Sequence, residues 1–254
     1  MNFRRIQRIF LCGFIIVDLL IVGVFFQGIF RRWHQASVTP EQAQAVTLRE
    51  MRAHGIKVPH LSTQPQKGSY VTVQADEFNT MPTIKRASVS IVDQQLNVTY
   101  DQPVKRSLAT LKHQVLAGNQ YHYDQKLSTN NRDVFTQLIN GQPVLTSAGQ
   151  LQFHRNQASV TGYSQGHLLK VTQLQQAAPT ISQQQAVINL YRHNDLNDNA
   201  QIKDVRLGYA PLNAIDDPTL YGPVWQVKVW DKTANHLQTL MVSALTGTIL
   251  QNDD

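Results

Sequence analysis

The sequence predicts an α+β protein: an N-terminal transmembrane helix followed by an ectodomain of antiparallel sheets with helices packed on one face, in two related subdomains. Three observations support this fold class. A long apolar run lies near the N-terminus, and short alternating segments separated by turn residues fill much of the remaining chain. In addition, a helical pattern followed by strands occurs once near each end of the ectodomain.

The apolar run covers residues 9–30, between arginines in residues 4–8 and the pair Arg31 and Arg32. A helix of this length can cross a hydrocarbon core of about 30 Å. The run is longer than the apolar part of a signal peptide and ends without a small-x-small cleavage site, so an uncleaved anchor is expected. The balance of positive charge favours a cytoplasmic stub at residues 1–8, which places the C-terminal domain outside the cell membrane.

Asp18 lies in the middle of the expected anchor. An ionisable residue at the centre of a membrane helix costs about 2.5–3.5 kcal/mol on insertion scales, so a compensating contact is expected. Contact with a partner helix is favoured over self-association and over simple tolerance of the carboxyl group. On a helix, the face of Asp18 also carries Phe14, Ile21, Val22 and Phe25, which are the predicted partner-contact residues.

Composition restricts what the ectodomain can do. The chain has a formal charge of +6, but five of its 23 Lys+Arg flank the anchor and Asp18 is one of its 17 Asp+Glu. The ectodomain therefore carries 18 cationic and 16 anionic side chains, which is no footprint for nucleic acid. The single cysteine, Cys12, lies in the anchor, so the ectodomain has neither disulfides nor thiolate metal sites. No cofactor is expected.

The ectodomain is predicted to form two units after a linker at residues 31–38. The first unit, residues 39–106, begins with a helix, because Thr39, Pro40 and Gln42 have the pattern of a capping box with proline at the first helical position. The next expected features are a helix stop at Gly55 and a hairpin with strands over residues 88–92 and 96–100.

The second unit, residues 107–254, begins as a meander of strands. Asn140-Gly141 between two apolar runs is a strong hairpin signal, because both residues tolerate positive φ. Thr180 or Ser182 caps a following helix, whose apolar residues form one stripe. The remaining expected strands cover residues 151–153, 158–163, 167–171, 203–209, 225–230, 240–244 and 248–250.

The segment Gly162-Tyr163-Ser164-Gln165-Gly166 fits the nucleophile elbow of α/β-hydrolases, and Asp195 or Asp198 and then His236 follow in the hydrolase order. The elbow requires a helix after the serine, whereas residues 167–171 continue as a strand. A glycine-flanked crossover between strands is therefore expected, and no catalytic residue is predicted. The nine histidines show no metal-ligand spacing, so no metal site is predicted.

The order of several segments is familiar. These segments cover residues 8–10, 14–20, 140–144, 149–153, 186–191, 202–209, 223–229 and 244–247. Together they resemble the YycI family, membrane-anchored regulators of the Yyc (Wal) sensor-kinase system of Gram-positive bacteria. The resemblance spans nearly the whole chain and places Asp18 where the anchor of the family has a polar residue.

The resemblance implies a non-enzymatic role. The protein would modulate a sensor histidine kinase of the WalK/YycG type, which controls cell-wall turnover, together with a YycH-like protein and through transmembrane-helix and ectodomain contacts. A rival class is an anchored envelope domain that binds peptidoglycan or inhibits a protease, because residues 225–250 also look like the strand pattern of PepSY-type domains. An enzyme is the third possibility and rests only on Ser164.

Overall fold

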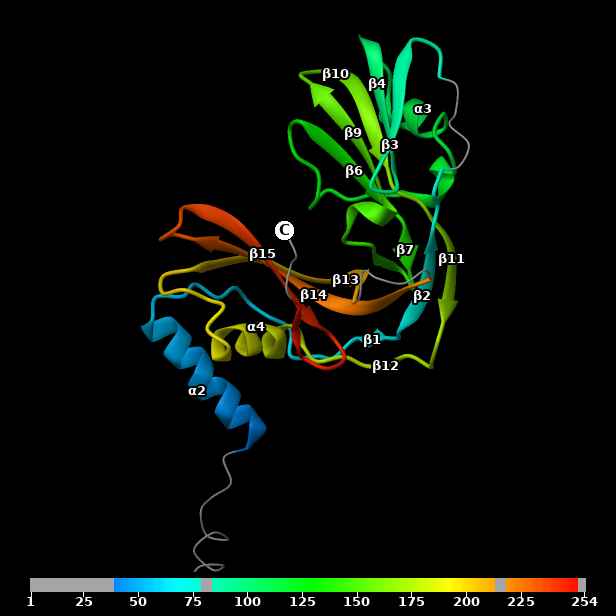
Figure 1. The fold of residues 1–254 in the computed structure, drawn as a ribbon. Coiled ribbons are helices and arrows are strands. Elements are labelled where there is room, and N and C mark those ends of the chain that lie inside the picture. The colour runs from blue at the N-terminus through cyan, green and yellow to red at the C-terminus, as the bar shows by residue number, and fades with distance from the viewer. Residues whose placement is uncertain (1–38, 79–83, 213–217, 251–254) are drawn as a thin grey trace, which may run out of the picture. The chain divides into compact units, whose positions relative to one another are not determined.

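The computed structural model describes residues 39–78, 84–212 and 218–250 (Figure 1). The chain forms two compact units, residues 1–46 and 47–254, and both large sheets belong to the second. Across the three described ranges, no helix is both long enough and apolar enough to cross a membrane.

Helix α2 begins with the predicted capping box. The Thr39 amide donates to Gln42 Oε1 over 3.1 Å, and the Gln42 amide donates to Thr39 Oγ1 over 3.3 Å. Gly55 follows the helix with a φ of +73°, the left-handed conformation that favours glycine after a C-terminus. The described helices are α2 (Pro40–Ala53), α3 (Leu108–Lys112) and α4 (Gln183–Arg192), with 3-10 turns η1 (Gly118–Gln120) and η2 (Ser147–Gly149).

The first large sheet, called here the β14 sheet, is built around its longest strand. Its order is β11-β2-β14-β15-β16, β13 also pairs with β14, and all of these pairings are antiparallel. Its strands are β2 (Val71–Ala75), β11 (Leu168–Gln173), β13 (Gln201–Pro211), β14 (Thr219–Asp231), β15 (His236–Ser243) and β16 (Ile249–Leu250). The strands predicted in the last fifty residues are confirmed and are longer than expected at several ends.

Helix α4 packs against the β14 sheet (Figure 1). Ser182 is its N-cap, because the Gln185 amide donates to Ser182 Oγ over 3.2 Å. Thr180, the alternative cap, instead accepts a hydrogen bond from the Gln66 amide. Trp225 of β14 is fully buried in the cluster below the sheet, and its indole N–H donates to the Ile181 carbonyl over 2.9 Å. This buried hydrogen bond thus fixes the orientation of the largest core side chain.

The second large sheet, called here the β10 sheet, has the antiparallel order β3-β4-β10-β9-β6-β5. Its strands are β3 (Ala87–Val92), β4 (Gln95–Val104), β5 (His122–Tyr123), β6 (Arg132–Thr136), β9 (Gln150–Asn156) and β10 (Ser159–Gln165). The predicted β3–β4 hairpin is confirmed. Its loop is the two residues Asp93 and Gln94, both with positive φ, rather than the three residues expected.

Aromatic side chains form the core on one face of the β10 sheet. Phe153 of β9 is fully buried between Phe135 and Tyr163, and the Phe135 and Phe153 rings meet edge to face at a centroid distance of 5.9 Å. Leu111 of α3 belongs to the same cluster. The short helix therefore covers the aromatic face of this sheet.

The Asn140-Gly141 hairpin is confirmed, with φ of +51° and +76° at its two turn residues. It joins β7 (Leu138–Ile139) to β8 (Gln142–Pro143) in a small sheet of their own, and β1 (Lys67–Gly68) pairs with β12 (Ala178–Pro179) in another. Mostly antiparallel sheets with few helices confirm the α+β class. The boundary between residues 106 and 107 stays a prediction, although both large sheets combine strands from its two sides.

Candidate functional site at the junction of the two sheets

The chain crosses between the two large sheets where β2 and β11 lie side by side (Figure 1). It leaves the β14 sheet after β2 and returns to it through Gly166 and His167, which connect β10 to β11. The two crossing segments remain paired beyond the strands, because the Asp76 amide donates to the His167 carbonyl over 2.8 Å. Polar side chains gather at this crossing.

His167 is 6% exposed and contacts an oxygen acceptor with each ring nitrogen. Its Nδ1 lies 3.0 Å from Asp76 Oδ2, and its Nε2 lies 3.1 Å from Gln120 Oε1. His167 therefore joins a residue after β2 to the turn η1 beside the β10 sheet.

Gln137 extends this network to β11. Its amide oxygen accepts the Leu168 N–H over 2.7 Å, and its Nε2 donates to the Leu168 carbonyl over 3.1 Å and to Gln120 Oε1 over 3.0 Å. The side chain therefore pairs with the backbone of Leu168 as a neighbouring strand would. Buried polar groups that are fully paired in this way hold neighbouring elements in one arrangement.

Tyr121 and Gln165 complete the crossing on the side of the β10 sheet. The Tyr121 hydroxyl donates to the Gly166 carbonyl over 2.7 Å and accepts from Gln165 Nε2 over 3.1 Å. Burial raises the pKa of Tyr121 far above its usual range, so the phenol stays neutral and remains a donor. Gln165 Oε1 is buried without a hydrogen-bond partner among the described residues.

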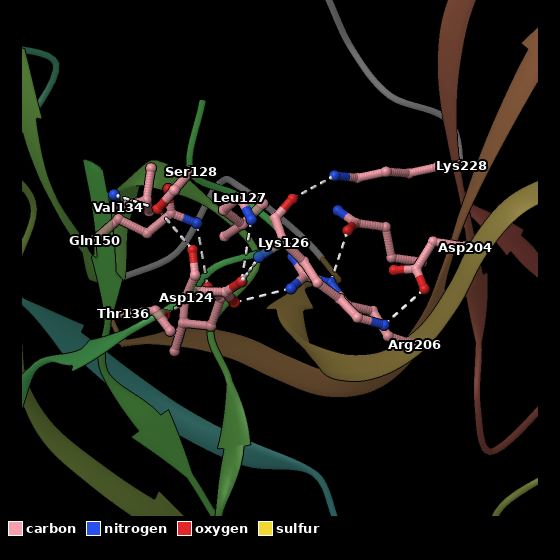
Figure 2. A network of polar contacts seen from close by, with 12 residues as sticks. Asp124, Lys126, Leu127, Ser128, Val134, Thr136, Gln150, Asp204, Arg206 and Lys228 are labelled. Carbon is pink, nitrogen blue, oxygen red and sulfur yellow. Dashed lines mark hydrogen bonds and ion pairs between the residues drawn. The ribbon is translucent and has the colours of Figure 1, made fainter. Parts of the chain in front are cut away.

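A second polar contact joins the sheets away from the crossing, and Figure 2 shows it from close by. Arg206 of β13 donates from Nη1 to Asp124 Oδ2 over 2.8 Å and from Nε to Gln226 Oε1 over 3.0 Å. Both side chains of the Arg206–Asp124 ion pair are only 10% exposed. Asp124 Oδ1 also accepts the amides of Lys126 and Leu127, so one carboxylate shapes its own loop and binds the opposite sheet.

Lys126 and Lys228 surround this ion pair with further charge (Figure 2). Lys126 Nζ lies 2.6 Å from Asp204 Oδ1, and Lys228 Nζ donates to the Lys126 carbonyl over 2.9 Å. Burial, and then the nearby Arg206 guanidinium, lower the pKa of Lys228. In the described ranges, no three His, Cys, Asp or Glu side chains are grouped as metal ligands would be. The ion pairs and hydrogen bonds of the junction are suited to fixing the two sheets together.

Ser164 lies within β10, and its surroundings differ from a nucleophile elbow. β10 is followed by another strand, β11, as the sequence predicted. A Cβ on Gly162 would lie 2.1 Å from the Val98 carbonyl oxygen, and one on Gly166 would lie 2.3 Å from the Ser147 carbonyl oxygen. Close approach of backbone therefore accounts for both glycines of the motif without any catalytic role.

The structure brings His154 and Asn97 to Ser164, in place of Asp195, Asp198 and His236. The Ser164 hydroxyl donates to Asn97 Oδ1 over 2.8 Å, and His154 Nε2 lies 2.8 Å from Ser164 Oγ. Because the one hydroxyl proton goes to Asn97, His154 must donate to Ser164. A general base has to accept that proton, so this arrangement does not activate the serine.

Asp18, Phe14, Ile21, Val22 and Phe25 lie outside the described residues, as do the stub, the anchor and the linker. Sequence reasoning did not identify the junction. Its residues lie far apart along the chain, and the turn residues around Asp124 were the only local signal that could have drawn attention to it.

Solved structures similar to the chain include the following two. An uncharacterized protein from Eubacterium rectale ATCC 33656 is 11% identical over 77% of this chain and 89% of that chain, with a TM-score of 0.41. The C-terminal domain of Bacillus megaterium YpeB is 13% identical over 84% of this chain and 96% of that chain, with a TM-score of 0.36. No curated protein gives a significant match.

The model of the YycI protein family matches residues 34–245 of the 254-residue chain. The match includes the β10 sheet, every strand of the β14 sheet except β16, the crossing at His167 and the Arg206–Asp124 contact. It confirms the resemblance read from the order of the segments. The chain belongs to the YycI family.

Proposed function

We propose that this protein is a membrane-anchored, non-enzymatic regulator of a cell-wall-controlling sensor histidine kinase of the WalK/YycG type. A YycH-like protein acts with it, through transmembrane-helix and ectodomain contacts. The match of the YycI family model over residues 34–245 carries this proposal, because membership of that family is consistent with regulation of the YycG/WalK system. The hydrogen-bond direction at Ser164 supports a non-enzymatic role.

In this proposal, residues 9–30 anchor the chain in the cell membrane, with the N-terminus in the cytoplasm and the C-terminal domain outside. Asp18 accepts a hydrogen bond or a charge from a partner helix, and Phe14, Ile21, Val22 and Phe25 pack beside it. Such a contact regulates a kinase only if it is more favourable in one state of the kinase than in the other. The free energy by which the equilibrium between the two kinase states shifts equals the difference in contact free energy between them.

The folded domain supports this role because a change at one of its large sheets can be passed to the other. Its two sheets are joined by buried polar contacts at His167 and at Arg206. A partner bound to either sheet would therefore act on the other through defined contacts rather than through a loose linker.

Substitution of Asp18 tests the proposal. Interhelical polar contacts are worth about 0.6–2 kcal/mol, so Asp18→Leu is expected to weaken association with the partner helices by about threefold to about thirtyfold. Asp18→Asn is the matched control, because an amide still forms hydrogen bonds, and it is expected to be nearly silent. A bacterial two-hybrid assay measures association of the anchor with the helices of the kinase and the YycH-like protein, and kinase output is read in the same cells.

Wild-type association and kinase output in Asp18→Leu would contradict the contact through the anchor. Replacement of residues 9–30 by an unrelated membrane helix separates the remaining alternative. Full function after that replacement would favour the anchored envelope domain that binds peptidoglycan or inhibits a protease.

A further inference from the structure

A hollow of about 770 Å³ lies between the end of β4, helix α3 and the segment that precedes β3. Its inner wall is formed by buried residues of the aromatic core, among them Tyr163, Leu111 and Val115. The volume is in the range of about 300–1,000 Å³ that is usual for small-molecule sites. This hollow is separate from the junction of the two sheets.

The charged side chains that line the hollow are mostly cationic. Lys85, Arg86 and Arg106 are opposed by one carboxylate, Asp101, which leaves a local excess of two positive charges. None of the three cations forms an ion pair with a described residue, although Arg106 Nη1 reaches Gln114 Oε1 at 3.4 Å. The ectodomain as a whole has an excess of only two positive charges. The lining of the hollow has an excess of the same size, so positive charge is concentrated here.

Two tyrosines add neutral hydrogen-bond donors. Tyr163 is only 3% exposed and Tyr100 is half-buried, and neither hydroxyl forms a hydrogen bond within the described part of the chain. Burial raises the pKa of both phenols, and Arg106 opposes this rise at Tyr100. Both hydroxyls therefore keep their protons at neutral pH.

We propose that this hollow binds a phosphate-bearing small molecule, with Arg86 and Arg106 contacting the phosphate and Tyr100 and Tyr163 donating hydrogen bonds to the ligand. Guanidinium groups bind phosphate oxygens in a bidentate geometry. Three cations around one hollow match a ligand with two negative charges, such as a phosphate, better than they match a ligand with one carboxylate. The apolar wall accommodates the organic part of a phosphate ester. This binding goes beyond kinase regulation and does not depend on it.

Isothermal titration calorimetry of the full chain in detergent micelles tests the site with glycerol 3-phosphate as the probe. Saturable binding is expected for the wild type. The double variant Arg86→Gln, Arg106→Gln is expected to weaken it by about tenfold or more, because it removes two charge-assisted contacts. Both arginines are exposed, so the variant should fold, and its thermal melting curve verifies this. Lys170→Gln, which removes an exposed cation of β11 outside the hollow, is the matched control and should bind as the wild type does.

Two further probes identify the source of the ligand. Binding of inorganic phosphate as tight as that of glycerol 3-phosphate, with the same dependence on the arginines, supports a site for free phosphate. Weaker binding of inorganic phosphate supports a phosphate ester, and uncharged glycerol should not bind. Absence of saturable binding to both phosphate probes, or equal affinity in the double variant and the wild type, would overturn the proposal.

Discussion

His154 shows how burial and a nearby cation control one side chain. Burial, and then the positive charge of Arg132, lower the pKa of His154. A histidine whose pKa is lower in the folded chain binds fewer protons there, so its contribution to stability falls as the pH drops below about 6.5, its ordinary value. We expect His154→Gln to lose less free energy of unfolding than the wild type between about pH 7.5 and about pH 5. Urea unfolding of the full chain at each pH measures this. Parallel profiles with a constant offset would show only the lost hydrogen bond to Ser164.

The sequence identified Ser164 and its flanking glycines but could not identify its partners. His154 and Asn97 reach Ser164 from the two strands that pair with β10. The register of both pairings shifts between Val160 and Gly162. A bulge of this kind cannot be counted from the sequence, so the facing residues could not be assigned even where the strands were correctly predicted.

The N-cap of α4 provides a prediction for a whole element. Ser182→Ala removes the oxygen that accepts the Gln185 amide, and loss of such a cap costs about 1 kcal/mol. For a domain of this size the melting temperature should fall by about 2–4 °C. Ser182→Asp is the matched control, because its carboxylate can cap the same amide, and it should melt near the wild type. An equal loss in both variants, measured by thermal unfolding, would contradict the role of the cap.

Elements with local signals were predicted well. The capping box at Thr39 and the Asn140-Gly141 turn depend on residue types within four positions, and both are confirmed. Strand β2 (Val71–Ala75) was missed, because it has five residues and its partners β11 and β14 lie far along the chain. Helix α3 has one turn and a single buried leucine, so it carries no periodic pattern.

Sheet membership is a property of the whole molecule and was not contained in local patterns. The α+β class followed from alternating segments and two helical stripes. The chain leaves the β14 sheet after β2 and returns only at β11, so strands distant in sequence become neighbours. Side chains that meet across the junction are equally distant: Arg206 and Asp124 lie 82 residues apart. These pairs form because the two sheets fold against each other at the junction. No spacing of residues in the sequence predicts them.

The two ion pairs of the junction should therefore differ sharply in their effect on stability. Asp124→Asn keeps an Oδ1 acceptor for the loop amides but leaves the buried Arg206 without its carboxylate, and breaking a buried pair in this way costs about 3–5 kcal/mol. Asp204→Asn removes the same charge from the exposed pair with Lys126, whose side chain is 57% exposed, and should cost about 0–1 kcal/mol.

Thermal unfolding of the full chain compares the two variants. We expect the melting temperature of Asp124→Asn to fall by about 6 °C or more, and that of Asp204→Asn by no more than about 4 °C. The substitutions are chemically identical and lie in one network, so net charge cannot explain a difference between them. Equal melting temperatures would mean that the Arg206–Asp124 contact does not hold the two sheets together, and the crossing at His167 would have to do so alone.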